Sequence, residues 1–185
     1  KDRLYTYGKN SIERRSARTA LYQILSTLVR IIAPVLSFTA EEAYQLLPWE
    51  KKESVFLEDW PEERAPDMKL LDKWERFFEI RKQVLKKIEE KREEKIIGSG
   101  LEAKVIIKGD RETVEFLQGL EGLAGLLIVS EVVISSGDTF DITVEKTLFG
   151  KCQRCWVHFP EIGTPEAPEI CFKCQQVLKD DGIHN

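Results

Sequence analysis

Two Cys-x-x-Cys pairs hold all four cysteines of this 185-residue chain and constrain its C-terminal part more than any other feature. Cys152 and Cys155 form the first pair and Cys171 and Cys174 the second, with fifteen residues between the pairs. This spacing is typical of a four-thiolate zinc site. Because residues 148–185 carry too little apolar content to fold by burial alone, we expect them to fold around one structural zinc ion.

Two disulfides are the alternative interpretation of the same cysteines. Cys-x-x-Cys loops make poor disulfide frameworks and nothing in the sequence indicates export, so zinc is favoured. Four thiolates would close the coordination sphere and leave no open position for catalysis. His158 and His184 are weaker ligand candidates, since four thiolates already suffice.

Charge is unevenly distributed, although the net charge is only −4. Residues 1–30 carry seven Lys or Arg against two acids, whereas residues 31–66 and residues 98–147 are both acidic. A basic segment on an acidic body favours one polyanion bound in one orientation. A charged helix face that is merely solvated is the alternative.

Residues 11–33 are predicted to form an amphipathic helix, with Asn10 and Glu13 as its capping pair. Its apolar positions follow the three–four spacing of one buried face: Ala17, Ala20, Leu21, Ile24, Leu25, Leu28, Val29 and Ile32. Three arginines lie in its first turns: Arg14, Arg15 and Arg18. Cations there oppose the helix dipole, so we expect them to serve an external anion.

Pro34 ends this helix, and a short helix is predicted from Thr39 to Leu47. Residues 48–66 are expected to be a loop or linker. A long helix should then run from about 68 to 97 and stop at Gly98. Its expected buried stripe is Leu70, Leu71, Trp74, Phe77, Phe78, Val84, Leu85 and Ile88.

The pattern changes to alternation beyond Leu101. We expect a strand at 103–108, a helix at 111–121 and strands at 126–134 and 139–146. This region has no paired catalytic acids, no nucleophile–base arrangement and no Gly-rich phosphate loop, so it is a scaffold. No apolar run approaches the roughly 18–20 residues of a membrane span.

The predicted fold class is therefore multidomain α+β. Residues 1–66 form part of a helical bundle with its linker, residues 67–147 a small α+β junction domain, and residues 148–185 a four-cysteine zinc finger. The N-terminus has neither an initiator methionine nor a signal peptide, which indicates a fragment of a longer protein.

Charged and aromatic residues surround the cysteines. Lys151, Arg154 and Lys173 are placed to offset the negative charge of four thiolates. Trp156 could cover the metal site with an apolar face. It could instead stack on an unpaired base, an interaction worth about 1–3 kcal/mol.

Four stretches together resemble the C-terminal part of bacterial-type isoleucyl-tRNA synthetases. The first is Lys-Asp-Arg-Leu-Tyr at 1–5 leading into Glu-Arg-Arg-Ser at 13–16 and Thr-Ala-Leu-Tyr at 19–22, and the second is Ala-Pro-Val-Leu-Ser-Phe-Thr-Ala-Glu-Glu at 33–42. The third is Arg-Lys-Gln-Val at 81–84 with Ile-Gly-Ser-Gly-Leu-Glu-Ala-Lys-Val at 97–105, and the fourth is Lys-Cys-Gln-Arg-Cys-Trp at 151–156 with Cys-Phe-Lys-Cys at 171–174. The resemblance covers nearly the whole chain in the expected order.

This resemblance implies a partner, the anticodon stem-loop of isoleucine tRNA, and a cytoplasmic enzyme that is a monomer at full length. The tRNA contacts that it implies are Arg14, Arg15, Arg18, Lys151, Arg154 and Trp156. It also implies that ATP and magnesium are used in a separate catalytic domain, since the chain lacks the His-x-Gly-His and Lys-Met-Ser-Lys-Ser motifs. The remainder of the synthetase would be the second partner.

Two alternatives remain open at this point. A DNA glycosylase of the formamidopyrimidine type ends in a similar finger, but the segment before Cys152 should then be helix-two-turn-helix and not α+β. A non-catalytic protein-interaction module is the other alternative.

Overall fold

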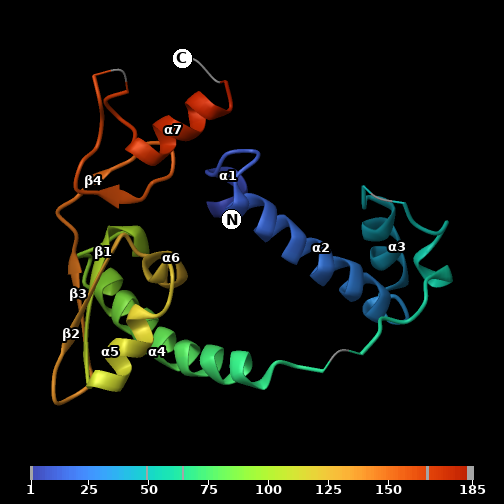
Figure 1. The fold of residues 1–185 in the computed structure, drawn as a ribbon, viewed down its shortest axis with the longest axis horizontal. Coiled ribbons are helices and arrows are strands. Elements are labelled where there is room, and N and C mark those ends of the chain that lie inside the picture. The colour runs from blue at the N-terminus through green and yellow to red at the C-terminus, as the bar shows by residue number, and fades with distance from the viewer. Residues whose placement is uncertain (1, 49, 64, 166, 183–185) are drawn as a thin grey trace. The chain divides into compact units, whose positions relative to one another are not determined.

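The computed structural model describes residues 2–48, 50–63, 65–165 and 167–182, and the chain folds as two compact units, residues 1–66 and 67–185 (Figure 1). The first unit is helical and the second is α+β with the four-cysteine segment at its end. The predicted α+β class is therefore confirmed. In the described ranges no helix is both long enough and apolar enough to cross a membrane.

The first unit is built mainly on a long helix and a shorter one, which are joined by a short turn. α1 (Asp2–Tyr5) precedes the long α2 (Ile12–Ile32), and α3 (Ser37–Gln45) packs against the end of α2. A single 3₁₀ turn, η1 (Val55–Leu57), lies beyond α3. The core of this unit is small and lies where these elements meet: Val29, Ala33, Ala40, Tyr44, Leu47 and Val55.

Side chains of α3 hold the segment that follows the helix. The Glu41 carboxylate accepts hydrogen bonds from Ser54 Oγ at 2.8 Å and from the Val55 amide at 2.9 Å. The buried Tyr44 hydroxyl bonds to the Glu58 carboxylate and lies 3.2 Å from the Lys52 carbonyl oxygen. Burial, reinforced by Glu58, raises the pKa of Tyr44 to about 12.

The predicted boundaries and faces of these two helices need correction. Ser11, rather than Asn10, caps α2, because its side chain accepts from the Arg14 amide. Thr39 lies inside α3, which begins at Ser37 without a side-chain cap. Of the predicted buried stripe of α2, Val29 is buried, whereas Leu21, Ile24, Leu25 and Leu28 are exposed.

The second unit places helices on one face of a three-stranded sheet, as Figure 1 shows. The strand order is β2 (Glu131–Ser136), β1 (Ala103–Gly109), β3 (Asp141–Lys146), with β1 parallel to β2 and antiparallel to β3. Alternate residues of β1 are buried, namely Ala103, Val105 and Ile107.

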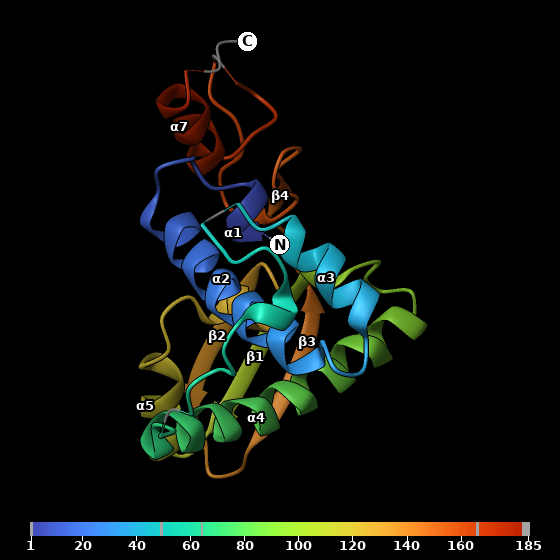
Figure 2. The ribbon, with the colours of Figure 1, turned by 90° about the vertical axis from the view of Figure 1, so that its right-hand side faces the viewer.

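Three helices supply the other half of this core. α4 (Met68–Glu93) spans the unit, and α5 (Arg111–Gln118) and α6 (Leu123–Leu127) lie on the crossover from β1 to β2. They contribute these buried residues: Phe77, Ile80, Val84, Ile88, Leu117, Leu123 and Leu127. Figure 2 shows the chain turned by 90° about the vertical axis, with the strands of this sheet labelled.

Three predictions for this unit were wrong in detail. α4 ends at Glu93, before Gly98, because Lys95 takes the left-handed conformation (φ 59°) that ends the helix. Ile80 is buried, while Leu70, Leu71, Phe78 and Leu85 of the predicted stripe are exposed. The predicted strand at 126–134 begins only at Glu131, since Leu123 and Leu127, four residues apart, bury one face of the short α6.

Candidate zinc centre and nucleic-acid interface

All four cysteines meet at one buried point. Their Sγ atoms lie within 4.8 Å of one another, and the Cys155 and Cys171 sulfurs are 3.9 Å apart. A disulfide would need about 2.05 Å between sulfurs. Four sulfurs held about 2.3 Å from a zinc ion in a tetrahedron lie about 3.8 Å from one another. The donor set and spacing fit one structural zinc ion, and the cysteines are free thiols.

Two local structures present these sulfurs. The first is a small hairpin of β4 (Gly150–Lys151) and β5 (His158–Phe159), closed by a hydrogen bond from the Cys152 amide to the Val157 carbonyl at 3.0 Å. The second is the start of α7 (Phe172–Asp180), where Cys171 is the N-cap residue. The Cys171 amide lies 3.3 Å from Cys152 Sγ, so a backbone N–H group points at this sulfur.

A few apolar side chains and one polar pair enclose the cluster. Gln175 is buried and donates to Thr164 Oγ1 at 2.9 Å, which ties α7 to the loop between the two cysteine pairs. The apolar residues packed around the sulfurs are Val157, Phe159, Ile162 and Ile170. This core is small, which fits a module that depends on metal for its stability.

Arg154 points at the cluster. Its Nη1 lies 3.4 Å from Cys174 Sγ. The hydrogen bond from Cys155, helped by Arg154, lowers the pKa of Cys174 to about 5, and the same Cys155–Cys174 pair raises the pKa of Cys155. A thiolate is thus favoured beside the guanidinium, and thiolates are the form that binds zinc.

Trp156 does not cover the cluster. The residue is 62 % exposed, and the Lys151 ammonium lies 5.9 Å from the centre of its ring. Its backbone is left-handed (φ 64°), and its amide donates to the Cys152 carbonyl at 2.8 Å. The finger therefore presents an aromatic face and a cation side by side at its surface.

Among the residues that the structure describes, no histidine belongs to the cluster. The four cysteines form the group, and His158 lies on β5, where its amide donates to Ser130 Oγ. His184 lies outside the described residues.

The three arginines in the first turns of α2 belong to the other compact unit. Arg14 is half-buried, and its Nη1 lies 3.4 Å from the Tyr7 carbonyl oxygen. Arg15 and Arg18 are exposed on the first turns of the helix. The structure thus pairs Lys151 with Trp156, directs Arg154 to a sulfur, and leaves Arg15 and Arg18 facing solvent.

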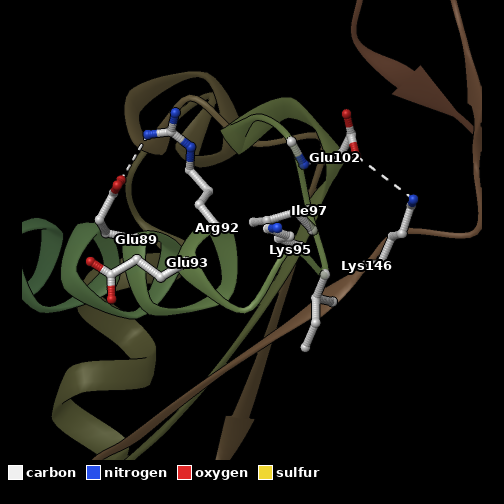
Figure 3. A pocket seen from close by; sticks show the side chains of 9 residues that line it. Glu89, Arg92, Glu93, Lys95, Ile97, Glu102 and Lys146 are labelled. Carbon is white, nitrogen blue, oxygen red and sulfur yellow. Dashed lines mark hydrogen bonds and ion pairs between the residues drawn. The ribbon is translucent and has the colours of Figure 1, made fainter.

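A hollow of about 430 Å³ lies at the end of α4, and Figure 3 shows its lining. Its lining contains two ion pairs: Arg92 with Glu89 at 2.7 Å, and Lys146 with Glu102 at 3.8 Å. Because acidic and basic side chains are equal in number in the lining, the hollow has no excess of either charge and we assign no ligand to it.

Two family models match the chain. Residues 1–107 match the anticodon-binding domain of tRNA ligase, and residues 149–177 match the zinc finger found in FPG and IleRS. The second description covers both protein classes that share this finger, so the finger by itself does not separate them.

Curated relatives match nearly the whole chain. Three of them are named isoleucine–tRNA ligase and come from Natranaerobius thermophilus (40% identity over 97% of this chain), Carboxydothermus hydrogenoformans (42% over 97%) and Fervidobacterium nodosum (43% over 98%). The chain spans about a fifth of the length of these relatives, 21% in each case.

Proposed function

This chain belongs to the anticodon-binding domain family of tRNA ligases, and on that premise we propose that it binds the anticodon stem-loop of isoleucine tRNA. It is the anticodon-binding and zinc-finger C-terminal region of isoleucine–tRNA ligase, since both family models and the relatives agree. The α+β fold before Cys152 and the match of residues 1–107 oppose the glycosylase alternative.

The conformation of Trp156 carries this proposal. A left-handed backbone costs a non-glycine residue about 1–2 kcal/mol. The side chain is mostly exposed, so burial does not compensate this cost. Strained residues that packing does not explain cluster at functional sites. An exposed indole beside Lys151 is suited to stack on an unpaired anticodon base while the ammonium meets a phosphate.

The arginines would supply the phosphate contacts. Arg15 and Arg18 face solvent and can approach the backbone of the stem, where cations fix register and orientation. Arg14 has one nitrogen near the Tyr7 carbonyl, and Arg154 has one at Cys174 Sγ. A guanidinium has five N–H donors, and we propose that both side chains also contact RNA.

The zinc ion is structural in this proposal, with Cys152, Cys155, Cys171 and Cys174 as its ligands. Four thiolates leave no open coordination position, so the metal holds the finger and takes no part in a reaction. Activation of isoleucine with ATP and magnesium is proposed for the part of the full-length ligase beyond this chain. Residues 1–66, 67–147 and 148–185 would be the helical, junction and finger parts of the tRNA-binding region.

The exposed apolar face of α2 would contact the remainder of the ligase. Leu21, Ile24 and Leu28 form a stripe along that face and are exposed. Contiguous exposed apolar surface marks an interaction site. The relatives are about five times as long as this chain, so a covering segment is available within one cytoplasmic monomer.

Binding to two tRNAs tests the proposal. The zinc-loaded chain should bind isoleucine tRNA more tightly than the same tRNA with a swapped anticodon, in filter binding at moderate salt. Equal affinity for both would refute recognition of the anticodon. Excision of a damaged base from duplex DNA by the chain would support the glycosylase alternative instead.

A further inference from the structure

The covalent link between the sheet and the finger has an unpacked residue at its centre. It runs through residues 147–149, from the end of β3 to the start of β4, and Leu148 in its middle is 99 % exposed. Thr147 is buried and anchored on the sheet side, where its amide donates to the Glu102 carbonyl at 2.8 Å. Its Oγ1 accepts from the Phe149 amide at 3.3 Å. The finger therefore leaves the sheet at a fixed point through an unpacked residue.

Ser130 makes a second connection across this joint. Its hydroxyl donates to the Leu101 carbonyl at 2.5 Å and accepts from the His158 amide at 2.8 Å. Leu101 lies in the turn before β1, and His158 lies on β5 of the finger. One hydroxyl thus joins two segments that are 28 and 29 residues away from it in the chain.

The surroundings of Ser130 hold it in place. A Cβ on Gly100 would come within 2.9 Å of the Ile128 carbonyl oxygen, so the two backbone segments that flank this hydroxyl are closely packed. Ile128 has a left-handed backbone (φ 60°), which ends α6 and turns the chain toward Ser130. The position of the Ser130 hydroxyl relative to the sheet is therefore fixed by the packing of these two segments.

The strand that Ser130 contacts lies beside Trp156 and Lys151, which we call the aromatic platform of the finger. His158 is paired with Lys151 across the hairpin, and the Lys151 ammonium lies over the Trp156 ring. The Trp156 amide is bonded to the Cys152 carbonyl, at the other end of the same turn. Ser130 thus accepts a hydrogen bond from β5, the strand that begins two residues after Trp156.

We infer that Ser130 is a positioning residue, whose hydroxyl sets the orientation of the zinc finger on the sheet and so the direction in which Trp156 and Lys151 face RNA. This inference rests on the proposed tRNA binding. Without the hydroxyl, the finger would keep its metal and its own fold but turn about the link at Leu148. The platform would then meet the anticodon loop in a range of orientations.

The test compares three variants of the full zinc-loaded chain. Ser130→Ala removes the hydroxyl, Ser130→Thr keeps one, and Ser136→Ala makes the same chemical change at the exposed far end of β2. Zinc content is measured for each variant. Amide residual dipolar couplings report whether the finger and the sheet share one alignment, and fluorescence anisotropy reports binding of the isoleucine tRNA anticodon stem-loop.

We expect one shared alignment in wild type, Ser130→Thr and Ser136→Ala, and two separate alignments in Ser130→Ala with zinc retained. Binding to the stem-loop should weaken about fivefold in Ser130→Ala, the factor set by one hydrogen bond of typical net strength. Ser130→Thr should restore it.

A shared alignment in Ser130→Ala, or separate alignments with unchanged affinity, would overturn the inference. Loss of zinc in Ser130→Ala would also overturn it, because the hydroxyl would then support the metal site itself. If the wild-type chain does not bind the stem-loop, the proposed function fails, whereas a failure confined to Ser130 leaves that function standing.

Discussion

Replacement of Trp156 separates the backbone cost of this residue from its contribution to RNA binding. Its φ of 64° is a conformation that glycine adopts freely and that alanine, like tryptophan, adopts at a cost. Trp156 is 62 % exposed, so removal of its ring takes little buried area from the finger. Trp156→Gly and Trp156→Ala therefore remove the same ring but differ in backbone strain.

The expected magnitudes follow from these two properties of the residue. Trp156→Gly should be more stable than Trp156→Ala by about 1 kcal/mol, since the left-handed penalty for a residue with a Cβ is about that size. Both variants remove the cation–π interaction with Lys151, which is worth about 0.5–1 kcal/mol at an exposed site. Both should weaken RNA binding by about 1–3 kcal/mol, the energy of one base stacked on an aromatic side chain.

Thermal unfolding of the zinc-loaded chains and anisotropy with the anticodon stem-loop measure the two effects. Equal stability of the glycine and alanine variants would refute the strain argument. RNA affinities within about twofold of wild type would refute the stacking role, because removal of one stacked base should exceed that factor. Release of zinc by either variant would show that the indole supports the metal site after all.

Three further changes have expected outcomes. Arg15→Ala should reduce the slope of log affinity against log salt by about 0.7–0.9, the range from one phosphate of a single strand to one of a duplex, and an unchanged slope in anisotropy titrations would exclude Arg15 as a phosphate ligand. The pKa of Tyr44 is raised, so the stability of residues 1–66 should hold below about pH 10 and fall as the pH rises through about 12. Tyr44→Phe should remove this loss of stability at high pH, although the variant also loses the hydrogen bond to Glu58. Urea unfolding followed by circular dichroism measures the stability of both proteins. A strong chelator should disorder residues 148–178 while amide signals of the sheet persist, and an ordered finger without metal would contradict the zinc assignment.

Helices and strands were predictable where the pattern was long or strictly alternating. α2 and α4 extend over many turns of regular apolar spacing, and β1 alternates cleanly, so each was located. The structure of residues 126–134 was not predicted correctly, because a short apolar stretch fits a helix and a strand equally well. Its first part forms the end of α6, and packing against the core decided between them.

Which face of a helix is buried was less predictable than its location. The spacing on α2 indicated one apolar face, but the structure buries Val29 and exposes Leu25 and Leu28. The spacing of apolar residues shows that a face can be buried, whereas burial requires a partner surface in space. On α4 the buried residue Ile80 was missed for the same reason.

The sequence by itself determined the metal site, because Cys-x-x-Cys turns are local structures whose spacing already fits one ion. It also identified Trp156 and the arginines as candidates, but not what they contact. Only the tertiary structure exposed the Trp156 ring beside Lys151, turned Arg154 to Cys174, and brought Ser130 to His158. The last two contacts join residues that are 20 and 28 positions apart in the chain. No local pattern encodes such contacts, because they arise only when the segments that carry them are packed together in space.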